Sequence, residues 1–109
     1  MKKKSTKIIR SPKSSKRQAL TVVSGERAFW VHQGPVLCHL IDLHHLFEAI
    51  TPVQFTYHTG RVGGNDFASW VKEVLGDAAC AAALARAKTP RASALAVKKY
   101  LRNYIVSHH

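Results

Sequence analysis

The strongest hydrophobic pattern in this chain lies between residues 65 and 76, and it predicts the central helix of the fold. Asn65 or Asp66 can cap the amide groups at the start of this helix, and Gly76 can adopt the left-handed conformation at its end. The apolar residues between them recur at spacings of three and four, which places them on one helix face: Phe67, Trp70, Val71, Val74 and Leu75. We therefore expect the other segments to pack against this helix.

Two helices are expected before the central one. Between residues 38 and 50, apolar residues recur at helical spacing. The segment Thr51-Pro52-Val53-Gln54 then carries three signals of a helix start, because threonine can cap, proline suits the first turn and glutamine can complete a capping box. These signals predict helices over residues 38–50 and 52–59.

Two more helices are expected after the central one. Asp77 can cap a helix over residues 78–87, whose run of alanines favours the helical state and permits close approach of a neighbour. Thr89-Pro90 can start a last helix that runs to residue 106. Its apolar side is formed by Ala94, Val97, Leu101 and Tyr104.

Together these segments indicate a mainly α fold, a compact bundle of four to five short helices. Residues 20–23 and 27–32 favour β-structure on either side of Ser24-Gly25, so they can form a small N-terminal β-hairpin. The large aromatic residues at stripe positions are expected in the core: Trp30, Phe47, Phe67 and Trp70.

The stretch from Phe55 to Asp77 contains a distinctive series of motifs. It runs Phe55-x-Tyr57-His58-Thr59, a glycine-bearing loop, Asn65-Asp66-Phe67-Ala68-x-Trp70-Val71 and Leu75-Gly76-Asp77. This series resembles a family of uncharacterised prokaryotic small helical domains, with similarity over roughly residues 28–106. The loop after Thr59 is short for that family, and Ala81–Leu84 lacks the expected glycine and acid. The resemblance implies a small helical domain and no activity, because the family is a domain of unknown function.

Basic residues are concentrated at the N-terminus. The formal net charge is +11, and the first 20 residues contain no acidic side chain. A segment of like charges with few apolar residues cannot bury enough surface to fold, so we expect a disordered basic tail over residues 1–19 and a small helical domain over residues 20–109. Ser11-Pro12-Lys13 matches part of the turn motif of histone-type DNA-binding tails. A solubilising or organelle-targeting tail would have a similar composition.

This charge distribution favours a non-enzymatic protein that binds DNA or RNA, associated with the nucleoid or the ribosome. Such a tail gains free energy by releasing counterions from phosphates, without reading the sequence. Basic side chains on the last helix can extend the same surface, although a solvated helix face explains them equally. The residues expected to contact nucleic acid are Lys2, Lys3, Lys4, Lys7, Arg10, Lys13, Lys16, Arg17, Arg91, Lys98, Lys99 and Arg102.

A second hypothesis places a ligand site at the loop before the central helix. It would make the protein a small-ligand or enzyme-like module, in which an imidazole oriented by a carboxylate serves as general base. The residues that can converge there are Tyr57, His58, Asn65 and Asp66. The structural alternative is that Asn65 and Asp66 cap the helix while His58 hydrogen-bonds to the loop or to a cap.

A third hypothesis is a protein-interaction adaptor that packs the small-residue face of residues 78–83 on a partner helix or on a second copy, giving a homodimer. We expect no metal and no cofactor. Cys38, Asp42 and His45 share one helix side and could bind Zn²⁺, but a polar outer face gives the same pattern. The two cysteines form no C-x-x-C pair, and no apolar run approaches the ~20 residues that span a bilayer. These features predict a cytoplasmic protein that does not enter membranes.

Overall fold

A computed structural model describes residues 18–60 and 64–105. In it, the central helix predicted from the sequence is α3 (Asp66–Glu73). Phe67 and Val71 on its apolar face are fully buried. Asn65 is the N-cap, because its side chain accepts a hydrogen bond from the Ala68 N–H at 3.1 Å. At the other end Gly76 has a φ of 77°, and the Asp77 N–H donates to the Val71 carbonyl at 3.0 Å. The predicted start, apolar face and stop are all confirmed.

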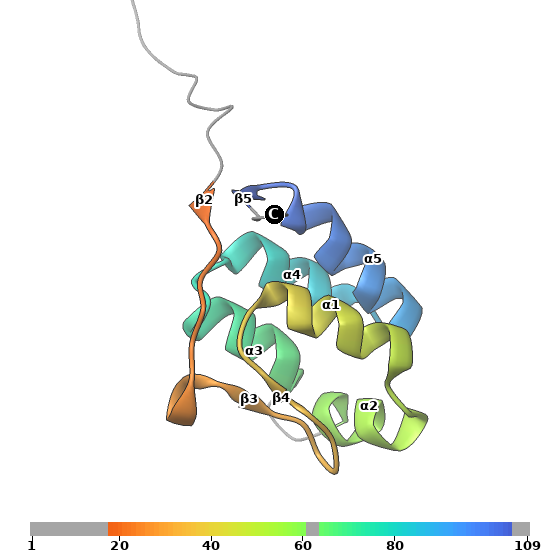
Figure 1. Ribbon diagram of the computed structural model, residues 1–109. Coiled ribbons are helices and arrows are strands. Elements are labelled where there is room, and N and C mark those ends of the chain that lie inside the picture. Colours follow the sequence, from red (N-terminus) through yellow and green to blue (C-terminus); the bar gives the residue numbers. More distant parts are fainter. Residues whose placement is uncertain (1–17, 61–63, 106–109) are drawn as a thin grey trace, which may run out of the picture.

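The other helices pack around α3 in a bundle (Figure 1). In the described residues they are α1 (Leu40–Ala49), α2 (Pro52–Thr59), α4 (Ala78–Arg86) and α5 (Pro90–Leu101). Helix α1 packs along α5, α4 packs against both α3 and α5, and α2 contacts α3 (Figure 1). The capping box of Thr51 and Gln54 is present, and Asp77 and Thr89 cap α4 and α5. The fold is mainly helical with a small β-hairpin, as the sequence predicts.

The hairpin contains one of the two predicted strands, within residues 27–32, but its partner strand is a different one. Strand β3 (Phe29–Trp30) pairs antiparallel with β4 (Val36–Leu37), and Ser24-Gly25 leads into the short 3₁₀-helix η2 (Gly25–Arg27). The chain turns at Gly34, whose N–H donates to the Val31 carbonyl at 3.0 Å. A Cβ at Gly34 would lie 2.7 Å from Nε2 of Gln54 and 2.9 Å from Cγ1 of Val31, so any larger residue would force these side chains to shift where α2 packs on the turn. The prediction that residues 20–23 form one strand is therefore wrong.

The last helix is shorter than predicted. It ends at Leu101 instead of residue 106, and Tyr104 lies in strand β5 (Tyr104–Ile105). Tyr104 is buried there, and its hydroxyl donates to Oδ2 of Asp77 at 2.5 Å. This contact joins residues 27 positions apart in the chain, so helical periodicity could not predict it.

Strand β5 pairs in parallel with β2 (Gln18–Ala19), which brings the first and last described segments side by side (Figure 1). The expected boundary between tail and domain at residue 20 therefore falls after a strand that is already part of the fold. Residues 1–17, for which a disordered tail is predicted, lie outside the described residues.

Two smaller expectations are also corrected. Helix α1 begins at Leu40 and not at Cys38, because His39 is its N-cap and accepts a hydrogen bond from the Asp42 N–H at 3.3 Å. Trp30 is 65% exposed and lies outside the core, because the alternation of β3 turns Phe29 inward and Trp30 outward. The other three predicted core aromatics are buried. Within the described ranges, no helix has the length and apolar character needed to cross a membrane.

Candidate functional site

His58, the proposed general base, is a buried residue of α2 with both ring nitrogens hydrogen-bonded. Its Nε2 accepts from the backbone N–H of His32 at 3.0 Å, and its Nδ1 lies 3.0 Å from Oδ2 of Asp66. Because a backbone N–H can only donate, Nε2 is unprotonated and the proton is on Nδ1, donated to the carboxylate. The ring also packs against Phe29 and Phe67, with centroid distances of 4.9 and 5.1 Å. His58 thereby links the hairpin, α2 and α3.

Asn65 and Tyr57 of this candidate ligand site also have structural contacts outside it. Asn65 caps α3 through its oxygen, and its Nδ2 donates to the Leu84 carbonyl on α4 at 3.2 Å. Tyr57 is 41% exposed, and its ring stacks on His32 with a centroid distance of 3.9 Å. Of the predicted set, His58 contacts both Asp66 and Tyr57, whose ring lies edge-on to the imidazole with a centroid distance of 4.9 Å, while Asn65 contacts other groups.

This geometry favours the structural alternative for His58. A general base needs an acceptor nitrogen within reach of its substrate, and Nε2 is already occupied by a backbone donor in a side chain that is 5% exposed. The carboxylate of Asp66 fixes the tautomer that makes this contact possible. The arrangement therefore holds the hairpin against α2 and α3.

Gln54 makes a second link between the hairpin and α2, which the sequence did not reveal. Its Oε1 accepts from the Thr51 N–H in the capping box, and its Nε2 donates to the carbonyls of His32 and Gln33, both at 3.1 Å. The capping motif was visible in the sequence, but the partners of Nε2 lie more than 20 residues away.

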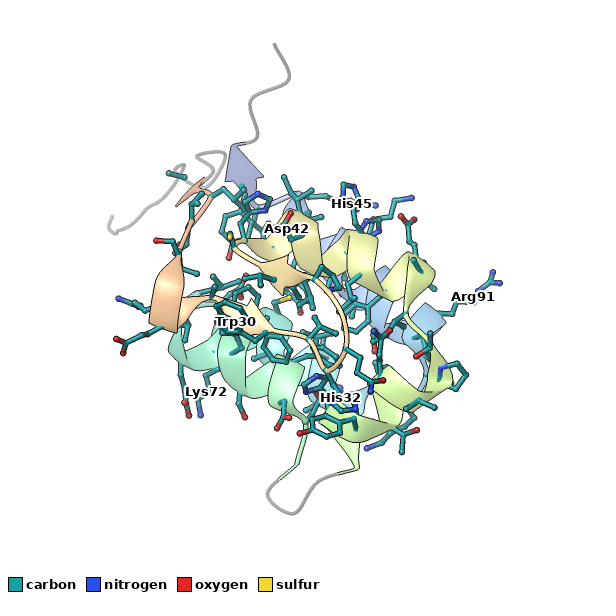
Figure 2. The ribbon with its side chains drawn as sticks, turned by 60° about the horizontal axis from the view of Figure 1, so that its bottom comes forward. Trp30, His32, Asp42, His45, Lys72 and Arg91 are labelled. Atoms are coloured by element: carbon teal, nitrogen blue, oxygen red, sulfur yellow. The ribbon has the colours of Figure 1, made fainter. Side chains whose placement is uncertain are left out.

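The eight cationic residues predicted in the tail, from Lys2 to Arg17, all lie outside the described residues. The four predicted on or after α5 are exposed. Arg91 and Lys98 line an open groove of about 610 Å³ between α1 and α5, and Figure 2 shows Arg91 projecting away from the molecule. Lys99 lies over the ring of Tyr100 at 5.6 Å, and Arg102 is the C-cap of α5. Lys98, Lys99 and Arg102 lie at the C-terminal end of α5, where cations offset the negative end of the helix dipole.

The β2–β5 ladder places Gln18 close to the C-terminal end of α5. Gln18, the residue that follows Arg17 in the sequence, pairs with Tyr104, which lies only three residues beyond the end of α5. Gln18, the first described residue, therefore lies beside the end of α5 that carries Lys98, Lys99 and Arg102 (Figure 1).

The candidate zinc ligands Cys38, Asp42 and His45 do not form a cluster. Asp42 and His45 both project from α1 (Figure 2), but Oδ2 of Asp42 accepts from the Cys38 backbone N–H at 2.8 Å. Within the part of the chain that the structure describes, no three side chains of His, Cys, Asp and Glu are placed to hold a metal ion.

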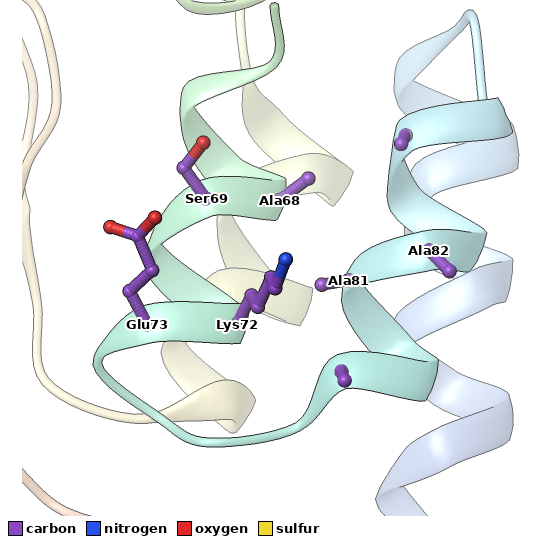
Figure 3. A pocket seen from close by; sticks show the side chains of 8 residues that line it. Ala68, Ser69, Lys72, Glu73, Ala81 and Ala82 are labelled. Carbon is purple, nitrogen blue, oxygen red and sulfur yellow. The ribbon is translucent and has the colours of Figure 1, made fainter.

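The small-residue face of α4 is used only in part inside the fold. Cys80 and Ala81 are buried, so part of the face proposed for an adaptor packs on the neighbouring helices. Ala82 lines an open groove of about 370 Å³ between α3 and α4, opposite Ser69 and Lys72 (Figure 3). Small residues alone specify no occupant for this groove, so the adaptor and the homodimer remain predictions.

Burial raises the pKa of two groups close to Asp77. The thiol of Cys80 has its pKa raised to about 12 by burial and by the charge of Asp77. The phenol of Tyr104 also has a raised pKa, because it is buried and donates to that carboxylate. Both groups are therefore neutral at physiological pH and act as packing groups, not as nucleophiles.

No protein family matches the chain. No curated protein and no solved structure is similar enough to count as a match.

Proposed function

We propose that this protein is a non-enzymatic nucleic-acid-binding protein that contacts the phosphate backbone of DNA or RNA, in association with the nucleoid or the ribosome. The residues proposed to contact the phosphates are the cations of the N-terminal stretch and the four cations on or after α5. Binding by these residues is not sequence-specific, because phosphates carry no base information.

The observation that carries the proposal is the pairing of Gln18 with Tyr104. Without it, two basic segments at opposite ends of the sequence would be unrelated. With it, Gln18, which follows the eight cations in the sequence, lies beside Tyr104, close to the end of α5 that carries the exposed cations Lys98, Lys99 and Arg102. A net charge of +11 on 109 residues adds a long-range attraction for polyanions.

The proposal predicts steep salt dependence of binding. A protein that neutralises Z phosphates of duplex DNA has a slope of about −0.9Z in a plot of log K against log salt concentration. Fluorescence anisotropy of a labelled duplex and a labelled RNA, measured over a salt series, gives this slope. Replacing the eight basic residues from Lys2 to Arg17 by glutamine should flatten the slope by several units and reduce affinity at low salt.

A matched control separates the location of charge from its amount. One variant changes the four cations on or after α5 to glutamine, and the other changes four exposed cations elsewhere: Arg27, Lys72, Arg86 and Lys88. Both variants lose the same charge, but only the first should lower the slope by about one unit per lost phosphate contact. Equal effects of the two variants, affinity that does not depend on salt, or no binding at low salt would each contradict the proposal.

A further inference from the structure

An exposed aromatic surface lies on the outer side of the hairpin and α2. In the described residues, six large hydrophobic side chains are exposed, and four of them belong to these two elements. Trp30 and Val36 are direct partners in the β3–β4 ladder, and both are on its outer face. Val53 and Tyr57 are four residues apart on α2 and so share one side of that helix. We call these four residues together with His32 the aromatic surface.

His32 connects the two elements. Its ring and that of Tyr57 are parallel within 4° and have a centroid distance of 3.9 Å. Figure 2 shows Trp30 and His32 on the same side of the molecule, along the hairpin. The rings of Trp30 and His32 on the hairpin and of Tyr57 on α2 therefore lie on a common side of the molecule.

These rings are held in place by bonds to rigid groups. The backbone of His32 donates to His58 through its N–H and accepts from Gln54 through its carbonyl. The indole Nε1 of Trp30 donates to the Gly25 carbonyl at 3.3 Å, so the edge of the ring is fixed while 65% of the residue remains exposed. A ligand that stacks on prepositioned rings loses little conformational entropy in ordering them.

We propose that the aromatic surface is a stacking platform for the unpaired bases of single-stranded nucleic acid, an inference that rests on the nucleic-acid-binding function proposed above. Any of the bases can stack on an aromatic ring. In single-strand binding proteins such rings commonly accompany cationic side chains that contact the nucleic-acid backbone. In a duplex the base faces are covered by neighbouring base pairs, so this surface adds affinity for single strands alone. The strong positive charge of the chain favours a polyanion over an uncharged protein segment as the occupant.

The first test compares a single-stranded RNA of about 16 nucleotides with a duplex of the same length, since single-strand sites span ~4–16 nucleotides. Trp30→Ala and Tyr57→Ala should each weaken single-strand binding about 5- to 150-fold and leave duplex binding unchanged. Because stacking releases no counterions, these variants should not alter the salt slope for the single strand. Val22→Ala is the matched control, because Val22 is 65% exposed like Trp30 but lies outside the aromatic surface.

Intrinsic fluorescence gives an independent readout. The chain has two tryptophans, and Trp70 is buried with its Nε1 bonded to the Arg27 carbonyl at 2.8 Å, so only Trp30 is accessible to a base. Single-stranded RNA should quench the wild-type protein but not Trp30→Phe. Circular dichroism of each variant checks that the helices are intact.

The results separate this inference from the proposed function. In one outcome, Trp30→Ala and Tyr57→Ala bind single strands as the wild type does, while the variants with glutamine in place of basic residues lose affinity. In that case the stacking proposal is wrong and the phosphate-binding proposal stands. That outcome would leave a protein partner as the occupant of the surface. Equal weakening of single-strand and duplex binding would also overturn the platform. If the wild type binds neither form at low salt, both proposals fail.

Discussion

Substitution of His58 by alanine should lower the free energy of unfolding by about 3–5 kcal/mol. The change removes the acceptor of the His32 N–H, and a partly buried donor left unpaired costs about 1–3 kcal/mol. It also leaves a void beside Phe29 and Phe67, and large-to-small changes in a core cost about 2–5 kcal/mol. The loss of the Asp66 contact adds less, because that side chain is 35% exposed to solvent.

Thermal unfolding followed by circular dichroism measures this effect. For a domain of this size, each kcal/mol shifts Tm by about 4–8 °C, so His58→Ala should unfold at least about 12 °C below the wild type. Asp66→Asn is the control, since its amide oxygen can still accept from Nδ1 of His58 and the helix cap provided by Asn65 is untouched. This control should shift Tm by only a few degrees.

The result that would refute the structural role is specific. If His58→Ala kept the wild-type Tm, the hydrogen bond to His32 would contribute nothing to holding the hairpin. If the same variant also lost a ligand or an activity that the wild type has, the imidazole would have a chemical role and the enzyme-like hypothesis would gain support.

Three further predictions concern buried polar groups. Ser93 is fully buried and its hydroxyl has no hydrogen-bond partner in the described residues, so Ser93→Ala should raise Tm or leave it unchanged, because removing an unpaired polar group recovers up to about 1–3 kcal/mol. Cys80 should resist a thiol reagent in the native protein, since burial raises its pKa to about 12, whereas half-buried Cys38 should be labelled first, as mass spectrometry of labelled peptides would show. Tyr104→Phe should cost about 1.5–3 kcal/mol at neutral pH, because it removes a hydrogen bond to the carboxylate of Asp77. Burial also raises the pKa of Tyr104, so its phenol stays protonated in the folded state above pH ~10 while the unfolded state ionises. Urea titrations at several pH values should therefore show wild-type stability falling as the pH rises above ~10, and a smaller fall in Tyr104→Phe.

The helices were predictable because their signals are local. Asn65 and Asp77 each bond to an amide three residues ahead, and Gly76 acts through its own backbone. The apolar face of α3 follows from residue spacing alone. Such features need no knowledge of distant parts of the chain.

Apart from the start of α1, the errors involve partners that are distant in the sequence. Residues 20–23 have β-propensity, but the strand that pairs with β3 is β4, fixed by a turn into which Gln54 packs. Tyr104 fits the spacing of α5, yet its hydroxyl bonds to Asp77 and its backbone pairs with Gln18. Trp30 is a large aromatic residue of the kind usually found in a core. Only the pairing of its strand shows that it lies outside the core.

At the candidate ligand site, too, the sequence predicted some contacts and missed others. The sequence indicated that His58 and Asp66 could meet, and they do. It gave no sign of His32, which supplies the backbone donor to His58 and the ring that stacks on Tyr57, because neither contact follows from a local pattern.

The parallel pairing of β2 with β5 also constrains the order of events as the chain folds. Its two strands come from the opposite ends of the described sequence, so closing this ladder carries a high loop-closure entropy and is expected late. During synthesis the bundle can assemble as soon as α5 has emerged, but β2 has no partner until Tyr104 leaves the ribosome. The pairing of Gln18 with Tyr104 is therefore made only in the finished molecule.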